Sequence, residues 1–192
     1  MAIEPNEQQL ILVGSDGGGL WRSIDAGASW TPLIDNADNM FVIAIGIDPH
    51  NTNHLLYMND NSELFRSLDQ GNTWEQIVNF NRSDKNGSKA IKFHPTIPNV
   101  YFVALRLEVI KTTDGGESFS TVLNQENEDI FFKPGDPTTM YSSGYDFWKS
   151  TDSGETWKKI TDGIVASERM KMTVTEADPN SCLLYTSPSP RD

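Results

Sequence analysis

The chain has 192 residues, enough for one domain with a buried core. Asp and Glu number 27 against 15 Lys and Arg, which gives a formal net charge of −12. This acidic balance argues against nucleic-acid binding, which depends on Lys and Arg neutralising phosphates, and against docking on anionic membranes. No run approaches the roughly 18 apolar residues of a transmembrane helix, so we expect no membrane insertion.

Short stretches of β-branched and aromatic residues recur along the chain and predict β-strands. They are separated by turn residues, and no window shows a sustained apolar period of 3.6 residues, so helices are not expected. In chain order the predicted strands are residues 10–14, 19–23 and 29–34, then 42–48, 54–58, 63–67 and 73–78, then 89–94, 100–104, 109–112 and 118–123, then 129–133, 139–143, 147–150 and 156–160, and finally 170–177.

Two independent markers show that these strands form a repeat of about 40 residues. An octet of the form Ser/Thr-x-Asp-x-Gly-x-x-aromatic occurs four times, each time between a third and a fourth strand. A proline follows each first strand and keeps a nearly constant distance from the next octet. Because four short strands per repeat are typical of a propeller blade, the sequence predicts an all-β propeller arc with an incomplete ring. The predicted blades are residues 2–35, 41–80, 88–125 and 127–163, with the first strand of a fifth at 169–178, all within one domain, 1–181.

Each octet has the composition of a tight hairpin turn. Asp can accept hydrogen bonds from N–H groups that follow it, Gly can adopt a positive φ, and a large ring after the turn can pack between blades. We therefore interpret the octet residues as structural. They are Ser23, Asp25, Gly27, Trp30, Ser67, Asp69, Gly71, Trp74, Thr112, Asp114, Gly116, Phe119, Ser150, Asp152, Gly154 and Trp157.

The octet resembles the Asp-box, or BNR repeat, of sialidases, sortilin/Vps10 domains, xyloglucanases and photosystem-assembly propellers. The resemblance covers residues 1–181. It implies a β-propeller whose boxes are structural and lie away from the ligand face. It also implies an extracellular or periplasmic location. A sortilin-like receptor is disfavoured because no cysteine-rich module follows.

The C-terminal residues 182–192 differ from the repeats. They read CLLYTSPSPRD, which resembles a translated adapter from sequencing-library construction, and we expect them to be a non-native tail outside the fold. Cys182 is the one cysteine of the chain, so disulfides and cysteine-ligated metals are not expected. The first ten residues lack the basic and apolar regions of a signal peptide. Because the adapter-like residues interrupt the repeats and a lone first strand of a fifth blade cannot close a ring, we expect a fragment whose remaining blades are missing.

Sialidases hold the substrate carboxylate with three arginines, and the sequence does not reproduce that arrangement. Arg22 and Arg66 precede octets at a position that is lysine in the other repeats, so we interpret them as periodic strand residues. Arg82, Arg106 and Arg169 have no matching context. Sialidase activity is therefore not expected.

The segment SDGGGLWRS at residues 15–23 is the best candidate for catalysis. It resembles a Thr-Asp-x-Gly-Gly-x-Tyr-Arg segment of xyloglucanase-type hydrolases, which implies that Asp16 is a candidate general base. Glycoside hydrolysis needs a second carboxylate across the scissile bond. Ser15 and Trp21 depart from the pattern, and a run of glycines also suits a hairpin turn, which is the interpretation we favour.

No metal or cofactor site is predicted. His50, His54 and His94 lie in or near the proline turns without paired ligand spacing, and residues 59–63 lack the length and glycine of a calcium loop. The sequence thus favours a non-catalytic, extracytoplasmic binding or scaffold propeller that presents loops to a carbohydrate or protein ligand. The alternative is a secreted glycoside hydrolase of xyloglucanase type with Asp16 as its general base.

Overall fold

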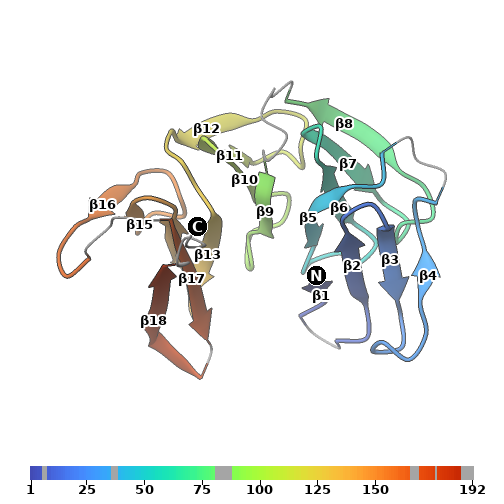
Figure 1. The fold of residues 1–192 in the computed structure, drawn as a ribbon, viewed down its shortest axis with the longest axis horizontal. Coiled ribbons are helices and arrows are strands. Elements are labelled where there is room, and N and C mark those ends of the chain that lie inside the picture. The colour runs from blue at the N-terminus through green and yellow to red at the C-terminus, as the bar shows by residue number, and fades with distance from the viewer. Residues whose placement is uncertain (6–7, 36–38, 81–87, 165–168, 176, 187–192) are drawn as a thin grey trace, which may run out of the picture.

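The fold is known from a computed structural model that describes residues 1–5, 8–35, 39–80, 88–164, 169–175 and 177–186. Over these ranges the chain forms strands and turns, and it contains no helix that could cross a membrane. The sheets stand side by side around an arc that is open on one side (Figure 1). The predicted all-β propeller with an incomplete ring is therefore confirmed.

Four sheets have four antiparallel strands each, in chain order, and a fifth sheet has two. The first sheet contains β1 (Ala2–Ile3), β2 (Ile11–Ser15), β3 (Gly19–Ser23) and β4 (Thr31–Pro32). The second contains β5 (Val42–Ile47), β6 (Leu55–Asn59), β7 (Glu63–Ser67) and β8 (Glu75–Asn79). The third contains β9 (Ser88–Phe93), β10 (Tyr101–Leu105), β11 (Glu108–Thr112) and β12 (Ser120–Leu123). The fourth contains β13 (Asp129–Lys133), β14 (Asp136–Ser143), β15 (Phe147–Ser150) and β16 (Lys158–Ile160), and the fifth contains β17 (Met170–Thr175) and β18 (Asp178–Thr186). We call these sheets blades 1 to 5.

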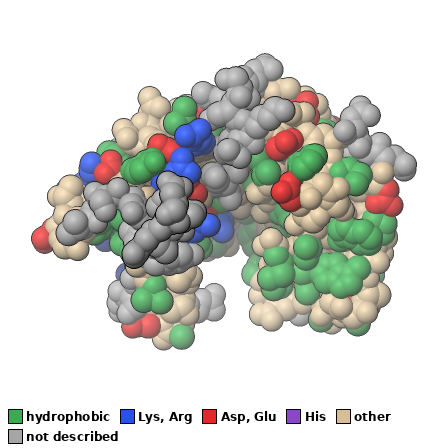
Figure 2. All heavy atoms as spheres, in the orientation of Figure 1, with side chains coloured by type: hydrophobic (Ala, Val, Ile, Leu, Met, Phe, Trp, Pro, Cys, Tyr) green, Lys and Arg blue, Asp and Glu red, His purple; other side chains and the backbone are tan. Residues whose placement is uncertain are grey.

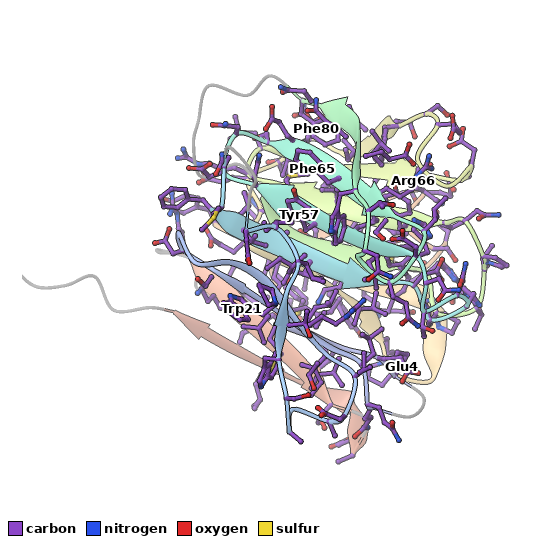
Figure 3. All side chains as sticks on the ribbon, turned by 90° about the vertical axis from the view of Figure 1, so that its right-hand side faces the viewer. Glu4, Trp21, Tyr57, Phe65, Arg66 and Phe80 are labelled. Carbon is purple, nitrogen blue, oxygen red and sulfur yellow. The ribbon has the colours of Figure 1, made fainter. Side chains whose placement is uncertain are left out.

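The second strands of blades 2 and 3 are buried on both faces. All five residues of β6 and all five of β10 are buried, because a neighbouring blade covers each face of the sheet. This double burial explains why these strands read as continuous apolar runs rather than alternating ones. Tyr57 and Phe65 lie side by side on β6 and β7 and stack with ring centroids 4.7 Å apart (Figure 3).

The core is divided into four apolar clusters, one between each pair of consecutive blades. Leu12 and Leu20 of blade 1 pack with Leu55 of blade 2, and Met58 of blade 2 packs with Val103 of blade 3. The same arrangement continues with Phe102, Ala104, Ile130 and Met140 between blades 3 and 4, and with Phe147, Met170 and Met172 between blades 4 and 5. Each blade is therefore held chiefly by its two neighbours.

Antiparallel strand order divides the loops between the two ends of each blade. The connections from first to second strand and from third to fourth strand lie at one end, which we call the octet end. The connections from second to third strand and from one blade to the next lie at the other, which we call the crossover end. The octets and the proline turns thus share one end of the arc.

The fifth blade has one strand more than expected. β17 pairs with β18, and Val174 faces Cys182 in this pairing. Residues 182–186, which we expected outside the fold, belong to β18, and residues 187–192 lie outside the described chain. The reason is local: Leu184 joins the apolar cluster around Met170 and Met172, as a second strand of a blade would.

Candidate functional site

Each octet aspartate is bound inside its own turn. In the first octet, Asp25 Oδ1 accepts hydrogen bonds from Ser23 Oγ at 2.7 Å and from the Ser29 amide at 2.8 Å, and Oδ2 accepts one from Ser29 Oγ at 2.6 Å. The same three contacts recur at Asp69, Asp114 and Asp152. The four carboxylates thus lie in four separate turns and share no pocket.

These hydrogen bonds stabilise the ionised carboxylates. Contacts from the hydroxyl and amide of Ser29, followed by the Ser23 hydroxyl, lower the pKa of Asp25 to about 2. The equivalent contacts from Thr73 lower the pKa of Asp69 to about 2, and those from Thr156 do the same for Asp152. The pKa of Asp114 shifts in the same direction. A carboxylate held in this state is a poor proton acceptor, which suits a structural role.

The octet aromatic residue lies directly before the fourth strand, which begins two residues later than predicted in each of the four blades. Trp74, Phe119 and Trp157 are half-buried and pack against the apolar clusters between blades. Trp30 is 41% exposed, since no blade precedes blade 1 in this chain. The ring therefore contributes to packing wherever a preceding blade is present.

A basic side chain joins each of blades 1 to 3 to the octet of the next blade. Arg22 Nη1 donates to the Gln70 carbonyl at 2.5 Å and lies 3.4 Å from Asn72 Oδ1. Arg66 contacts the Gly115 carbonyl at 3.1 Å and Glu117 at 3.5 Å, and Lys111 contacts the Ser153 carbonyl at 3.2 Å and the Glu155 carboxylate. In Figure 3, Arg66 lies beside the yellow-green strands of blade 3. We call this contact the inter-blade latch.

The latch always uses the same two octet positions. The carbonyl belongs to the fourth residue, which has a positive φ of 59° at Gln70, 75° at Gly115 and 55° at Ser153. The side-chain oxygen belongs to the sixth residue, Asn72 or one of the two glutamates. The basic position before the octet therefore has a role that its periodicity alone did not reveal.

Asp16 lies in a hairpin turn between β2 and β3, at the crossover end. Its side chain is exposed and makes no hydrogen bond or ion pair with the rest of the described chain. Gly17 and Gly19, on either side of Gly18, have φ values of 86° and 74°, as expected for a glycine-rich turn. Trp21 Nε1 donates to the Gly18 carbonyl at 2.8 Å, so the tryptophan closes the turn. The geometry fits the hairpin interpretation of this segment.

Sequence reasoning missed a charged cluster at the crossover end of blades 3 and 4. Arg106 Nε lies 3.4 Å from Glu126 Oε1, and Arg169 Nη2 lies 3.2 Å from the same oxygen. Arg169 Nε also lies 3.6 Å from Glu128, and its guanidinium lies 5.6 Å from the centre of the Tyr145 ring. We call these five residues the crossover cluster. Figure 2 shows basic and acidic side chains beside one another in this part of the surface.

The backbone beneath the crossover cluster is held rigidly. The Asn127 amide donates to the Arg106 carbonyl at 2.7 Å, and the Glu128 amide donates to the Ser143 carbonyl at 2.6 Å. Buried Asn127 also accepts a hydrogen bond from Ser142 Oγ at 2.6 Å. The two arginines were set aside for lack of a motif. The signal that could have found them is topological, because both lie in connections that the predicted strand order places at the same end.

Arg82, the remaining arginine considered above, lies outside the described residues.

Two cavities of about 420 and 260 Å³ lie along the first strands of the blades, which line them. The second contains Lys92 and Asp129, and burial raises the pKa of this aspartate, an effect that Lys92 partly offsets. His54 Nδ1 lies 3.0 Å from Asp48 Oδ2 within the proline turn of blade 2. Over the described ranges, no three His, Cys, Asp or Glu side chains are grouped so as to hold a metal ion.

Comparisons with known proteins agree with this geometry. Residues 18–107 match the family Sortilin-Vps10 (sortilin, neurotensin receptor 3). The chain has a β-propeller fold, and residues 18–107 are similar to the Sortilin-Vps10 family. Among curated proteins, none matches this propeller's sequence.

Solved structures of several propellers resemble this one. A GH74 enzyme from Niastella koreensis superposes with a TM-score of 0.80 at 19% identity, over 96% of this chain and 33% of that one. A GH74 xyloglucanase from Xanthomonas campestris gives 0.72 at 16% identity, over 96% and 34% of the two chains. A peptide-bound YCF48 gives 0.61 at 15% identity, over 86% and 54%. At these identities the likeness establishes the fold, and this propeller spans about a third to a half of the proteins that it resembles.

Proposed function

We propose that this propeller is a non-catalytic binding or scaffold module that presents its crossover end to a glycan or a protein. The observation that carries the proposal is that the polar groups at the two ends of the blades are bonded differently. At the octet end, each repeated carboxylate is bonded within its own turn. At the crossover end, charged and aromatic groups from four connections converge, and both arginines and Tyr145 are accessible to solvent.

The crossover cluster has the chemistry of a polar recognition surface. Tyr145 is 46% exposed and offers an aromatic face, on which the apolar face of a sugar ring or a peptide side chain can pack. Arg106 and Arg169 supply planar donors to hydroxyl, carbonyl or carboxylate groups. Because the backbone below is pinned by hydrogen bonds, little ordering is needed on binding. The peptide bound to the YCF48 propeller supports a binding role for a fold of this kind.

The test measures binding to xyloglucan by affinity electrophoresis in gels with and without the polysaccharide. We expect retardation of the wild-type protein and its loss in Tyr145→Ala. Trp30→Ala is the matched control, since it removes an equally exposed aromatic ring from the octet end. Retardation that is lost in Trp30→Ala and kept in Tyr145→Ala would contradict the assignment of the crossover end.

A second candidate is a glycoside hydrolase of xyloglucanase type with Asp16 as general base. The supporting observation is that this exposed carboxylate lies at the crossover end, where a substrate could reach it. The assay is release of reducing sugar from xyloglucan by the wild type and by Asp16→Asn. We expect no release from either, and release that Asp16→Asn abolishes would favour the hydrolase. An extracytoplasmic location belongs to both proposals.

A further inference from the structure

The inter-blade latch is incomplete at blade 4. Lys149 occupies the basic position that Arg22, Arg66 and Lys111 occupy in blades 1 to 3. Its ammonium group makes no hydrogen bond or ion pair among the described residues. Lys149 therefore lacks the partner that each of its three counterparts has.

The surface around Lys149 is a groove of about 330 Å³ over β15 and β16. It is lined by Lys149, Thr151, Thr156, Trp157, Lys158 and Ile160. β17 packs against β13 and β14 (Figure 1). Phe147 and Ile160 of the two outer strands reach the cluster around Met170 and Met172, and the described part of the fifth blade leaves the groove beside them uncovered. The groove therefore has room for a pair of strands packed against β15 and β16, as the third and fourth strands of one blade pack against those of the next.

Ile160 in this groove corresponds to residues that hold an octet elsewhere. Leu33 and Ile77 follow the octet aromatic by three positions, as Ile160 does. A Cβ on Gly71 would lie 2.7 Å from Leu33, and one on Gly116 would lie 3.1 Å from Ile77. The octet glycines of blades 2 and 3 thus pack directly against this apolar residue of the preceding blade, whereas Gly154 packs against Phe102 and Met140. Ile160 lies at the equivalent position of blade 4, and no octet of the described residues packs against it.

The positive charge of the groove indicates what charge a binding partner should carry. Lys149 and Lys158 face one another across β15 and β16, whereas in blade 2 the corresponding pair is Arg66 and Glu75. Two opposed lysines favour a partner that brings negative charge. In the existing latches the sixth octet residue supplies it, as Glu117 or Glu155 does.

We propose that this groove is the receiving half of a latch and binds an octet-bearing β-hairpin with a carboxylate or amide oxygen at the sixth octet position. The hairpin lays its octet against Trp157 and Ile160, and Lys149 donates to the fourth carbonyl and to the sixth side chain. A second copy of this propeller is a poorer occupant. Its exposed octet, in blade 1, has Ala28 at the sixth position and so offers no side-chain acceptor.

The test uses a peptide of residues 147–160, cyclised head to tail so that the hairpin is formed before binding. This peptide carries Glu155 at the sixth octet position. Fluorescence anisotropy of the labelled peptide measures its Kd for the full chain. We expect saturable binding that weakens about tenfold or more when the protein carries Lys149→Met, as expected for loss of a charge-assisted hydrogen bond.

Controls separate the latch from general charge effects. Lys159→Met should leave the Kd unchanged, because Lys159 pairs with Asp146 and does not line the groove. A peptide with Glu155→Ala should bind the wild-type protein about tenfold more weakly than the original peptide does. The Lys149→Met protein should bind both peptides with the same Kd, because the contact between Lys149 and Glu155 is already lost. Thermal melts verify that both protein variants are folded.

Three results would overturn the proposal. They are the absence of saturable binding, equal losses in Lys149→Met and Lys159→Met, and independent effects of Lys149→Met and the peptide's Glu155→Ala. A dimer of the propeller that Lys149→Met dissociates, without peptide binding, would assign the groove to a second copy instead.

Discussion

At the scale of single residues, the hydroxyl that opens each octet is the best protected polar group of the turn. Thr112 is 1% exposed, and its Oγ1 accepts the Gly116 amide at 2.9 Å while donating to Asp114 at 2.7 Å. The hydroxyl therefore links a buried amide to a solvent-facing carboxylate. If it is removed, the Gly116 amide loses its acceptor, whereas Asp114 keeps the two hydrogen bonds from Ser118.

Thr112→Val should lower the free energy of unfolding by about 1–3 kcal/mol, because it leaves the buried Gly116 amide without an acceptor. Thr112→Ser is the matched control: it keeps the hydroxyl and should cost less than about 1 kcal/mol. Urea unfolding followed by circular dichroism measures both. If the two variants are equally stable, the hydroxyl does not stabilise the turn.

The pKa values of the octet carboxylates predict how the free energy of unfolding depends on pH. Folding lowers the pKa of Asp25, Asp69 and Asp152 to about 2, whereas an unfolded aspartate titrates near 3.9. Stability from a lowered pKa is fully present above the unfolded value and is lost as pH falls toward the folded value. We expect the free energy of unfolding to be level above about pH 5 and to fall between about pH 4 and 2.

Urea unfolding at a series of pH values measures this decline. Asp152→Asn should flatten it between about pH 4 and 2, since one titrating carboxylate is removed. Asp162→Asn is the control, because Asp162 is an exposed aspartate outside the octets for which no hydrogen bond is found within the described chain. A slope that Asp162→Asn reduces as much as Asp152→Asn does would rule out the octet as its source.

At the scale of the turn, close packing between neighbouring elements constrains the octet glycine. Gly154 has a φ of 77°, and a Cβ there would lie 2.6 Å from Phe102. Gly163 has a similar φ of 72°, but no atom lies within 4 Å of its Cβ position. The two glycines share the backbone strain, and Gly154 alone has the steric conflict.

Gly163→Ala should therefore cost about 1–2 kcal/mol from strain alone. Gly154→Ala should cost a further 1–3 kcal/mol, roughly, from overpacking against blade 3. Thermal unfolding of both variants measures the difference. Equal losses would mean that blades 3 and 4 separate easily enough to accept the methyl group.

The aromatic residue after each octet should matter according to its neighbours. Trp74 lies edge-on to Tyr57 with centroids 4.8 Å apart and packs in the cluster between blades 1 and 2, whereas Trp30 is 41% exposed. Trp74→Ala should cost about 3–5 kcal/mol, and Trp30→Ala should cost less than about 1 kcal/mol. A loss below about 0.5 kcal/mol in Trp74→Ala would show that the ring contributes little to packing.

At the scale of the whole molecule, the propeller could be predicted because its markers are local. Each octet and each proline specifies a turn by its own residues, and four copies in register define the blades. The crossover cluster could not be predicted, because Arg106 and Arg169 meet at Glu126 only through the placement of separate connections. The pairing of β18 was not predicted because its residues were judged by their resemblance to an adapter and not by their short apolar run, Cys182 to Tyr185.

The open arc also predicts the behaviour of the chain in solution. Trp21 and Trp30 at one end of the arc and the groove over β15 and β16 at the other leave apolar surface uncovered. β18 adds a free strand edge at the same end as the groove. We therefore expect low solubility and concentration-dependent self-association in sedimentation velocity, and a single sharp monomer boundary at high concentration would contradict this.

The division of the core into separate clusters between consecutive blades has a mechanical consequence. A tensile force applied between the two chain ends would load the interfaces in series, since the main contacts between described strands run within a blade or between adjacent blades. Rupture of one interface releases about 40 residues of slack and relaxes the remainder. A force–extension curve of this protein should therefore show several steps of similar length, one for each interface, rather than a single cooperative unfolding event.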